Sequence, residues 1–379
     1  MSGNINRINT LTSLRFFAAI MIIIGHSRGV FFNENIFNHF AFFQGVSFFF
    51  VLSGFILTIV YPTLSKQHVG QFYLARFARI WPAHIAALML FLLLFHNKIT
   101  INLSQFMILL TNVNLIHGWI PDVDYYFSFN APSWSISTEA FFYFCFPLLI
   151  YRWRHTWFFK LILSFGLVVL LIIYCNLANL KETTTVPGIH GLIYINPLSR
   201  IFEFILGMVF ASAFKKFNND KLSFVIMSFL ELSALLLIFI NLLYSANLAT
   251  NTIIPLNLAE QYWVIYCSTC IWFAFLILFV SMQNGIVSRV LNFPIIVLLG
   301  EMSYSLYLVH YLFMFYCYTH GAWWLRHHPV ETYIFYWFVI LCWAYLMWRL
   351  IECSARKWIK NSVYSSPSFK KLSLMNLAD

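Results

Sequence analysis

Two ionisable side chains, Arg15 and His26, lie in the first long apolar stretch of the chain. An ionisable group inside a membrane span is costly and is therefore a functional candidate by default. The spacing of eleven residues, at about 100° each, places both side chains on one helix face, about 16 Å apart along the axis. A neutral imidazole accepts a proton near pH 7, so His26 is a candidate general base. An arginine near the membrane surface and a histidine hydrogen-bonded to a neighbouring helix explain the same pattern equally well.

A second candidate is the RFAR segment that contains Arg76 and Arg79. Two arginines one helical turn apart form a fork suited to phosphate groups. Ordinary positive charge in a cytoplasmic loop is the alternative. Neighbouring aromatic residues and Pro82 indicate an ordered segment, which favours a binding role. We expect both arginines to lie in the loop that follows the second span.

Glu139 lies in PSWSISTEAFFY, at the expected start of the fourth span. A carboxylate there can pair with a buried cation or orient a histidine. A helix N-terminal acid that follows Pro132 and Ser133 explains it as well.

Three polar residues of the ninth apolar stretch, Ser303, Tyr307 and His310, share a helix face at i, i+4 and i+7. Such a stripe lines a cavity or ties helices together. Arg200 and Glu203, spaced i,i+3, favour mutual neutralisation within one helix.

Two further patterns do not predict a site. Cys267 and Cys270 have the spacing of a zinc or redox pair but no second ligand pair, so we expect no metal. His117 and Asp122 match the HxxxxD spacing of glycerolipid acyltransferases. The companion motifs of that family are missing, and the expected topology places this pair outside the cell.

The elements that position these residues are membrane helices. Hydrophobic residues make up 61% of the 379 residues and charged residues only 9%, which excludes a soluble enzyme and a disordered chain. We predict an all-α bundle of about ten transmembrane helices. A further stretch, 100–117, is predicted to lie at the surface or to be re-entrant. The ten predicted spans are 11–31, 40–61, 81–96, 134–151, 157–177, 194–214, 222–244, 261–281, 295–318 and 332–350.

The basic residues predict the orientation. With a cytoplasmic N-terminus, most of the 23 Lys and Arg residues fall on the cytoplasmic side, and only four fall outside. Those four are Arg28, Lys98, Lys181 and Arg326. This split predicts that both termini are cytoplasmic. The net charge of +10 therefore does not indicate nucleic acid as a partner.

Taken together, these residues resemble the acyltransferase-3 family of membrane O-acyltransferases, which has an Arg, ten residues and then a His in its first span. Here that motif is LRFFAAIMIIIGH, residues 14–26. Six more stretches are similar to the family in the same order, and the resemblance covers residues 10 to about 360. They are GVSFFFVLSGFI (45–56), FYLARFARIWP (72–82), PSWSISTEAFFY (132–143), SRIFEFILGMV (199–209), GEMSYSLYLVH (300–310) and IECSARKW (351–358).

The resemblance implies transfer of an acyl group, usually acetyl, from cytoplasmic acyl-CoA to a hydroxyl of an envelope glycan or lipid-linked saccharide. It implies His26 as the general base or as a transient acyl carrier, with Glu139 orienting or polarising His26 or the acceptor. Arg15, Arg76 and Arg79 would hold acetyl-CoA as a co-substrate, and no metal is expected. The acceptor cavity would be lined by Trp134, Ser303, Tyr307 and His310.

The same resemblance implies a multi-pass protein of the bacterial inner membrane, in contact with lipids. We expect residues 1–360 to form one transmembrane domain and residues 361–379 a cytoplasmic tail. No segment resembles the SGNH esterase-like domain fused to some members, so a two-step transfer would need a separate partner.

The main alternative is a transporter or flippase whose polar stripes line a pathway. It does not explain the RFAR pair, and no internal repeat is present. The other large family of membrane-bound O-acyltransferases uses an Asn and a His, for which His310 is the sole candidate. A scaffolding role is disfavoured by the cost of the buried charges.

Overall fold

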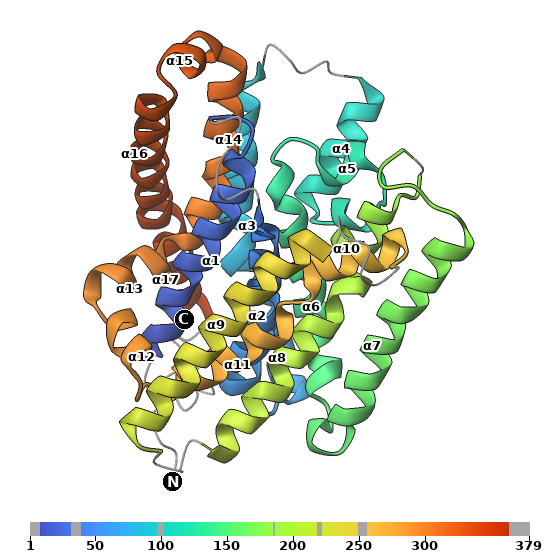
Figure 1. Ribbon diagram of the computed structural model, residues 1–379, viewed down its shortest axis with the longest axis vertical. Helices are drawn as coiled ribbons and strands as arrows, with labels where there is room; N and C mark the ends of the chain where they lie inside the picture. The colour runs from blue at the N-terminus through green and yellow to red at the C-terminus, as the bar shows by residue number, and fades with distance from the viewer. Residues whose placement is uncertain are drawn as a thin grey trace.

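The computed structural model describes residues 8–31, 39–96, 102–184, 186–217, 222–248 and 256–363. These residues form a helical bundle in which α1 (Asn9–Ser27) and α2 (Gly45–Val60) lie at the centre (Figure 1). The other long helices are α3 (Val69–Leu94), α6 (Trp134–Ile150), α7 (Trp153–Leu177), α8 (Pro197–Phe217), α9 (Phe224–Leu248), α14 (Ser303–His320) and α16 (Pro329–Met347). The shorter ones are α4 (Leu103–Val113), α5 (Val123–Tyr126), α10 (Leu258–Cys267), α11 (Cys270–Ser281), α12 (Ile286–Leu291), α13 (Pro294–Glu301), α15 (Ala322–His327) and α17 (Cys353–Val363).

The prediction of an all-α polytopic bundle is confirmed. In the described part of the chain, nine helical stretches are long and apolar enough to cross a membrane. The number is ten when the bent pair α13 and α14 counts as one span. The segment predicted to lie at the surface contains α4, whose 11 residues are too few to cross a bilayer. The predicted tail falls mostly outside the described residues, which end at Val363.

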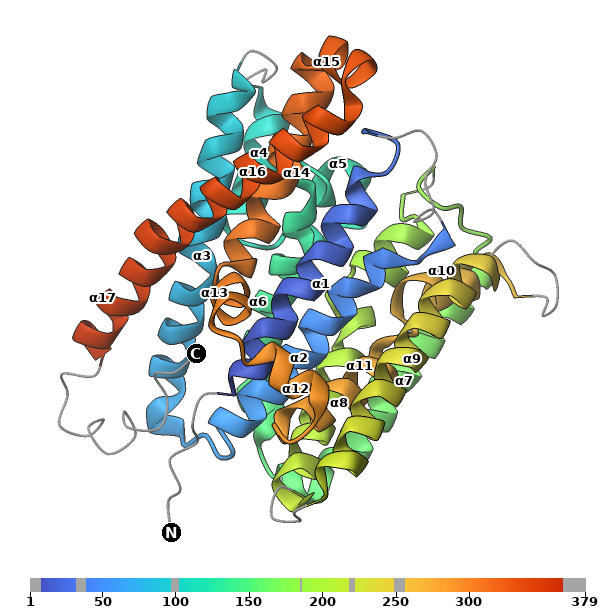
Figure 2. The same cartoon turned by 60° about the vertical axis from the view of Figure 1, so that its left-hand side comes forward.

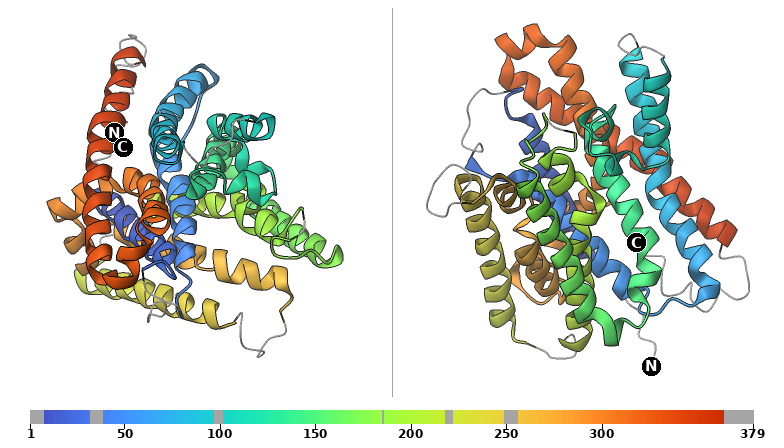
Figure 3. Two further views of the ribbon diagram at one scale, coloured as in Figure 1. Left: turned by 90° about the horizontal axis from the view of Figure 1, so that it is seen from above. Right: turned by 90° about the vertical axis from the view of Figure 1, so that its right-hand side faces the viewer.

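The peripheral helices present apolar side chains to their surroundings. Large exposed residues include Leu170 on α7, Phe229 on α9 and Phe335 on α16. Figure 3 shows α7 and α16 at opposite edges of the bundle when it is viewed from above. A protein in water does not expose so many large apolar side chains over whole helices. These faces therefore fit contact with lipid.

Two helix bounds differ from the prediction in ways that affect the site. α3 begins at Val69 and not near residue 81, so Arg76 and Arg79 lie inside a membrane-spanning helix and not in a loop. Pro82 does not end this helix. It removes one backbone hydrogen bond, and Tyr304 of α14 donates a hydrogen bond to the Ile80 carbonyl nearby, at 2.8 Å. α1 ends at Ser27 and not at residue 31, which places His26 in its last turn.

Two predicted spans are broken helices. α10 and α11 are separated at Ser268 and Thr269, where the Gln44 side chain accepts a hydrogen bond from the Thr269 amide at 2.6 Å. α13 and α14 meet at Met302 with a bend of 61°. The bend makes Ser303 the first residue of α14, at the level of the candidate site.

The central helices α2 and α8 approach each other through two glycines. A Cβ atom on Gly54 would lie 1.9 Å from the Phe204 carbonyl oxygen, and one on Gly207 would lie 1.9 Å from that of Val51. Small residues at a helix interface allow such close backbone contact inside membranes. This contact holds α2 and α8 at the core of the bundle, and α2 lines the candidate site.

Candidate active site

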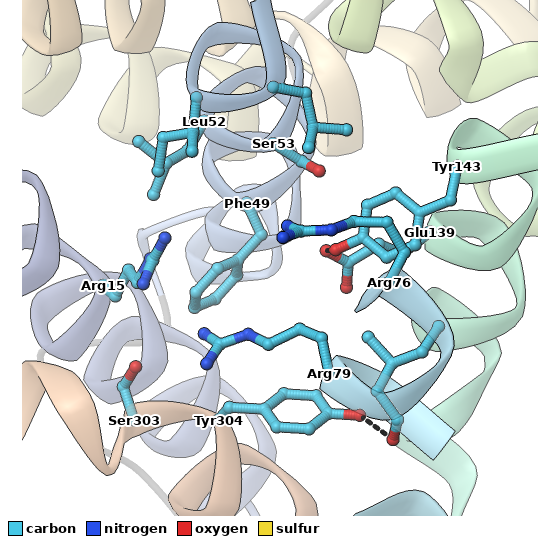
Figure 4. A pocket seen from close by; sticks show the side chains of 13 residues that line it. Arg15, Phe49, Leu52, Ser53, Arg76, Arg79, Glu139, Tyr143, Ser303 and Tyr304 are labelled. Carbon is cyan, nitrogen blue, oxygen red and sulfur yellow. Dashed lines mark hydrogen bonds between the residues drawn. The ribbon is translucent and has the colours of Figure 1, made fainter. Parts of the chain in front are cut away.

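The first cavity is formed where α1, α2, α3, α6 and α14 meet, and we call it the arginine cavity. Three arginines direct their side chains into it, Arg15 from α1 and Arg76 and Arg79 from α3 (Figure 4). Its volume is about 80 Å³. The remaining lining residues are Phe49, Leu52, Ser53, Ile56, Leu57, Ile80, Glu139, Tyr143, Ser303 and Tyr304. Three guanidinium groups around one small space form a site for an anion with several charges.

Glu139 is the acidic residue of this cavity. Its Oε1 atom accepts a hydrogen bond of 2.5 Å from the Tyr143 hydroxyl group, one turn further along α6. Figure 4 shows both side chains on the side of the cavity opposite Arg15, next to Arg76. Glu139 therefore provides a negative charge within the basic cluster.

The second cavity lies toward the end of α1 that carries His26, and we call it the aromatic cavity. Its volume is about 220 Å³. His26 lines it together with Phe43, Val46, Phe127, Ala131, Pro132, Trp134, His190, Tyr194, Tyr266, Tyr307 and Tyr311. Aromatic walls with a few polar groups are typical of sites for small organic ligands. Among the residues that the structure describes, the two histidines are the only acidic or basic ones in this lining.

His26 and His310 are joined by a hydrogen bond. The Nδ1 atom of His26 lies 3.1 Å from Nε2 of His310, and Nδ1 of His310 lies 2.5 Å from the Tyr307 carbonyl oxygen. A carbonyl oxygen only accepts, so Nδ1 of His310 carries its proton and, in a neutral ring, Nε2 is an acceptor. Nδ1 of His26 must then be the donor. The network thus assigns the free lone pair of His26 to Nε2.

An aromatic pair stands between the two cavities. Phe49 lines the arginine cavity, Tyr307 lines the aromatic cavity, and the centroids of their rings are 6.0 Å apart. The Tyr307 hydroxyl group is fixed by Ser135 Oγ at 2.8 Å and by the Pro132 carbonyl at 2.9 Å. The two rings thus connect the walls of the two cavities, and we call this pair the partition.

The structure divides the predicted site residues between the two cavities. Arg15, Arg76, Arg79, Glu139 and Ser303 line the arginine cavity. His26, Trp134 and Tyr307 line the aromatic cavity. His310 is not part of its lining, but it is hydrogen-bonded to His26. Glu139 and His26 are thus in different cavities, and His26 has hydrogen bonds to His310 and to the Ile22 backbone.

Two residues near the site had no role in the sequence analysis. Glu352, at the end of the π-helix η8 (Trp348–Glu352), forms an ion pair with Arg79 at 3.7 Å. His190, at the start of the π-helix η7 (His190–Ile195), lines the aromatic cavity, and its ring lies 5.1 Å from that of Tyr194. The contact between Arg79 and Glu352 joins segments far apart in sequence, and the His190 ring also lies 5.7 Å from that of Tyr266, on a distant helix. The one sequence feature that marked Glu352 is its place in IECSARKW.

The buried charges outside the two cavities have structural partners. Arg200 pairs with Glu203 at 3.1 Å, as the i,i+3 spacing predicted, and also donates a hydrogen bond to Ser47 Oγ at 3.0 Å. Glu231, which had no predicted partner, accepts hydrogen bonds from the amides of Val287 and Ser288 at 2.9 and 3.2 Å. These contacts account for the charges without a transport pathway.

The two candidates that the sequence analysis rejected also have structural contacts. Cys267 lies at the break between α10 and α11, where Arg200 donates a hydrogen bond to its sulfur. His117 is buried, and its Nε2 atom lies 3.2 Å from Ser133 Oγ. Burial and the neighbouring His84 ring lower the pKa of His117 to about 3.

The fold and the two cavities define a polytopic membrane protein in which His26 lines the same cavity as Tyr307 of the partition. A family model described as an acyltransferase domain matches residues 8–349. The chain therefore belongs to the acyltransferase-3 family, as the motifs predicted.

Curated relatives carry acyltransferase names. The chain is 27% identical over 229 residues to the acyltransferase MdmB of Streptomyces mycarofaciens, which covers 56% of this chain and 58% of MdmB. It is 26% identical over 368 residues to the putative O-acetyltransferase SACOL0978 of Staphylococcus aureus (strain COL) and 25% identical over 368 residues to the O-acetyltransferase OatA of Staphylococcus aureus (strain NCTC 8325 / PS 47). These two matches cover 92% of this chain and 57% of each relative. The chain thus spans less than two thirds of the length of these relatives. No solved structure matches it.

Proposed function

We propose that the chain is an O-acetyltransferase of the bacterial inner membrane. It takes the acetyl group from cytoplasmic acetyl-CoA and transfers it to a hydroxyl group of a cell-envelope glycan or lipid-linked saccharide. The observation that carries this proposal is the arrangement along α1. Arg15 lines the arginine cavity, and His26 lines the aromatic cavity beyond the partition.

The donor fits the arginine cavity. Coenzyme A carries several phosphate charges, and arginine forms bidentate hydrogen bonds with phosphate. The basic residues of the chain predict that the N-terminal end of α1 faces the cytoplasm, where acetyl-CoA is available. Arg15, Arg76 and Arg79 would therefore hold the phosphates, with Glu139 and Tyr143 fixing the position of Arg76.

The acceptor fits the aromatic cavity. A sugar ring has apolar C–H faces and polar edges, and the ring faces and hydroxyl groups of Tyr194, Tyr266 and Tyr307 match both. Trp134 adds another aromatic wall. In this assignment Ser303 belongs with the donor, because it lines the arginine cavity.

Nε2 of His26 is the reactive atom. In one route it accepts the proton of the acceptor hydroxyl, whose oxygen attacks the thioester carbonyl while the CoA thiolate leaves. In the other route Nε2 attacks the thioester carbonyl and releases CoA, and the hydroxyl oxygen then takes the acetyl group from the imidazole. Both routes use the lone pair that the hydrogen bond to His310 leaves free. The second route suits a donor and an acceptor that occupy cavities on opposite sides of a partition.

The test compares the acetyl content of envelope glycans, measured by mass spectrometry, in cells that make the normal chain or the His26→Ala variant. The matched control is His155→Ala, which removes an exposed histidine at the start of α7. We expect His26→Ala to abolish acetylation at normal protein levels and the control to keep it. Full acetylation in the His26→Ala cells would refute the proposal. A change in the amount of surface glycan, with its acetyl content unchanged, would support the flippase alternative.

A further inference from the structure

One carboxylate, that of Glu352, connects three elements next to the arginine cavity. Its Oε2 atom lies 3.7 Å from Nη1 of Arg79 on α3 and 3.3 Å from Nη2 of Arg356 on α17. Its Oε1 atom accepts a hydrogen bond of 2.5 Å from the Ser305 hydroxyl group on α14. The two arginines are thus held side by side through a single acidic group.

Exposure increases outward from this carboxylate. The Glu352 side chain is 2% exposed, that of Arg79 is 19% exposed and that of Arg356 is 31% exposed. Arg79 lines the arginine cavity, whereas Arg356 is not part of its lining. Arg356 is therefore the more exposed of the two arginines and lies outside the lining of the arginine cavity.

The C-terminal helix is placed to contribute to this site. Figure 2 shows α17 running alongside α3, and the two helices are in contact. Arg356, in the first turn of α17, follows Glu352, the last residue of η8, by four positions, and its Nη2 atom donates a hydrogen bond to the same carboxylate oxygen that pairs with Arg79 of α3. A carboxylate between two guanidinium groups neutralises only one positive charge, which leaves the pair attractive to an anion.

We propose that Arg356 is a donor-binding residue that contacts the 3′-phosphate of coenzyme A, and that Glu352 is the positioning residue that holds it next to Arg79. This inference rests on the proposed function, because it takes acetyl-CoA as the donor. The acetyl end of the donor must point inward to His26, so the adenosine end, which carries the 3′-phosphate, lies at the solvent side. Of the two arginines paired with Glu352, Arg356 is the more exposed and lies outside the cavity lining, which fits the outer end of the donor.

The experiment measures the binding of two probes to the purified full-length protein in lipid nanodiscs, by isothermal titration calorimetry. The probes are acetyl-CoA and 3′-dephospho-acetyl-CoA, which differ by the one phosphate group. We expect the normal chain to bind acetyl-CoA about tenfold more tightly, as one charge-assisted hydrogen-bonded contact provides. Arg356→Ala should lose this preference by weakening acetyl-CoA alone.

Two further variants separate a specific contact from general charge. Lys357→Ala removes an equal charge from the exposed face of the same helix and should keep the full preference. Glu352→Gln retains the shape of the side chain but not its charge. Glu352→Gln should reduce the preference for acetyl-CoA, because the ion pair that holds Arg356 is lost. Glu352→Asp, which keeps the carboxylate, should restore part of that preference.

Equal weakening of both probes by Arg356→Ala, or the same loss in Lys357→Ala, would overturn the assignment of Arg356 while leaving the proposed function intact. If the normal chain binds neither probe, the proposed donor is wrong and this inference falls with it. If Arg356→Ala does not yield folded protein, Arg356→Lys replaces it. The lysine keeps the charge but not the fork, so it should retain only part of the preference.

Discussion

The Nδ1 atom of His26 and the Nε2 atom of His310 lie 3.1 Å apart, although the two residues are separated by 284 positions in the chain. The His310 ring is itself oriented by its contact with the Tyr307 carbonyl. This relay fixes which nitrogen of His26 keeps its proton. His310 is therefore a positioning residue for the proposed reaction.

Replacing His310 by Phe removes its Nε2 atom as an acceptor for the His26 Nδ1 proton while preserving a ring of similar size. We expect kcat to fall about 100-fold or more, since general base catalysis contributes about 10²–10⁴-fold. The KM for acetyl-CoA should not change, because His310 lies outside the arginine cavity. His310→Gln, which keeps an acceptor oxygen, should lose less activity than His310→Phe. Steady-state kinetics on purified protein give both values, and a normal kcat in His310→Phe would contradict the proposed relay.

Arg76 and Arg79 are the predicted phosphate ligands of α3. Replacing both by Ala should raise the KM for acetyl-CoA by about 100-fold or more, since each hydrogen bond to a charged group contributes about 1.5–3 kcal/mol. The control is Arg154→Ala, which removes an exposed arginine near the start of α7. An unchanged KM in the double variant would mean that the two arginines only set the orientation in the membrane.

The contact between α2 and α8 predicts a stability effect. Gly207→Ala would place a methyl group 1.9 Å from the Val51 carbonyl oxygen, so the helices must separate. We expect a loss of about 1–3 kcal/mol, the usual cost of overpacking. Thermal unfolding in detergent gives the measurement. Gly166→Ala on α7, where no atom lies within 4 Å of the added Cβ, should leave the midpoint unchanged or slightly higher. Equal midpoints for the two variants would contradict the close packing.

The lowered pKa of His117 predicts that acid destabilises the folded protein. Its pKa is about 3 in the folded chain, because of burial and the His84 ring, and about 6.5 when unfolded. Between these values the unfolded state binds the extra proton, so stability falls as the pH falls below about 6.5. From pH 7 to pH 5 this group should cost about 2 kcal/mol.

The measurement for His117 is the thermal midpoint between pH 7 and pH 5. The midpoint should drop less in His117→Gln than in the normal chain. His155→Gln, at an exposed position, should follow the normal chain. The same drop in all three proteins would show that His117 does not titrate in this way.

The features that follow from local periodicity were predictable from the sequence. The apolar stretches gave the spans, and the spacing of Arg15 and His26 placed both on one face of α1. The ends of the helices were harder to predict where a helix continues through a pair of charged residues. α3 extends back through Arg76 and Arg79 because no proline interrupts residues 69–81, and the helix tolerates Pro82.

The contacts between distant segments were not predictable from one sequence. The pairing of Arg79 with Glu352 depends on how α3 packs against the C-terminal helices, and no local pattern encodes that register. Glu139 illustrates the same limit. The sequence allowed it to orient a histidine or to pair with a cation, and only the packing places it beside Arg76. The bend at Met302, which makes Ser303 the first residue of α14, follows Gly300, but a single glycine does not by itself predict a bend of 61°.

The rings of Phe49 and Tyr307 have a consequence for the energy balance of the cell. A continuous water-filled channel between the two faces of the membrane would let protons flow down their gradient and dissipate it. If the proposed reaction holds, these two contacting rings would keep water from connecting the cavities while the acetyl group passes from donor to acceptor. The cell would then modify glycans outside its membrane at the cost of acetyl-CoA alone, without spending its proton-motive force.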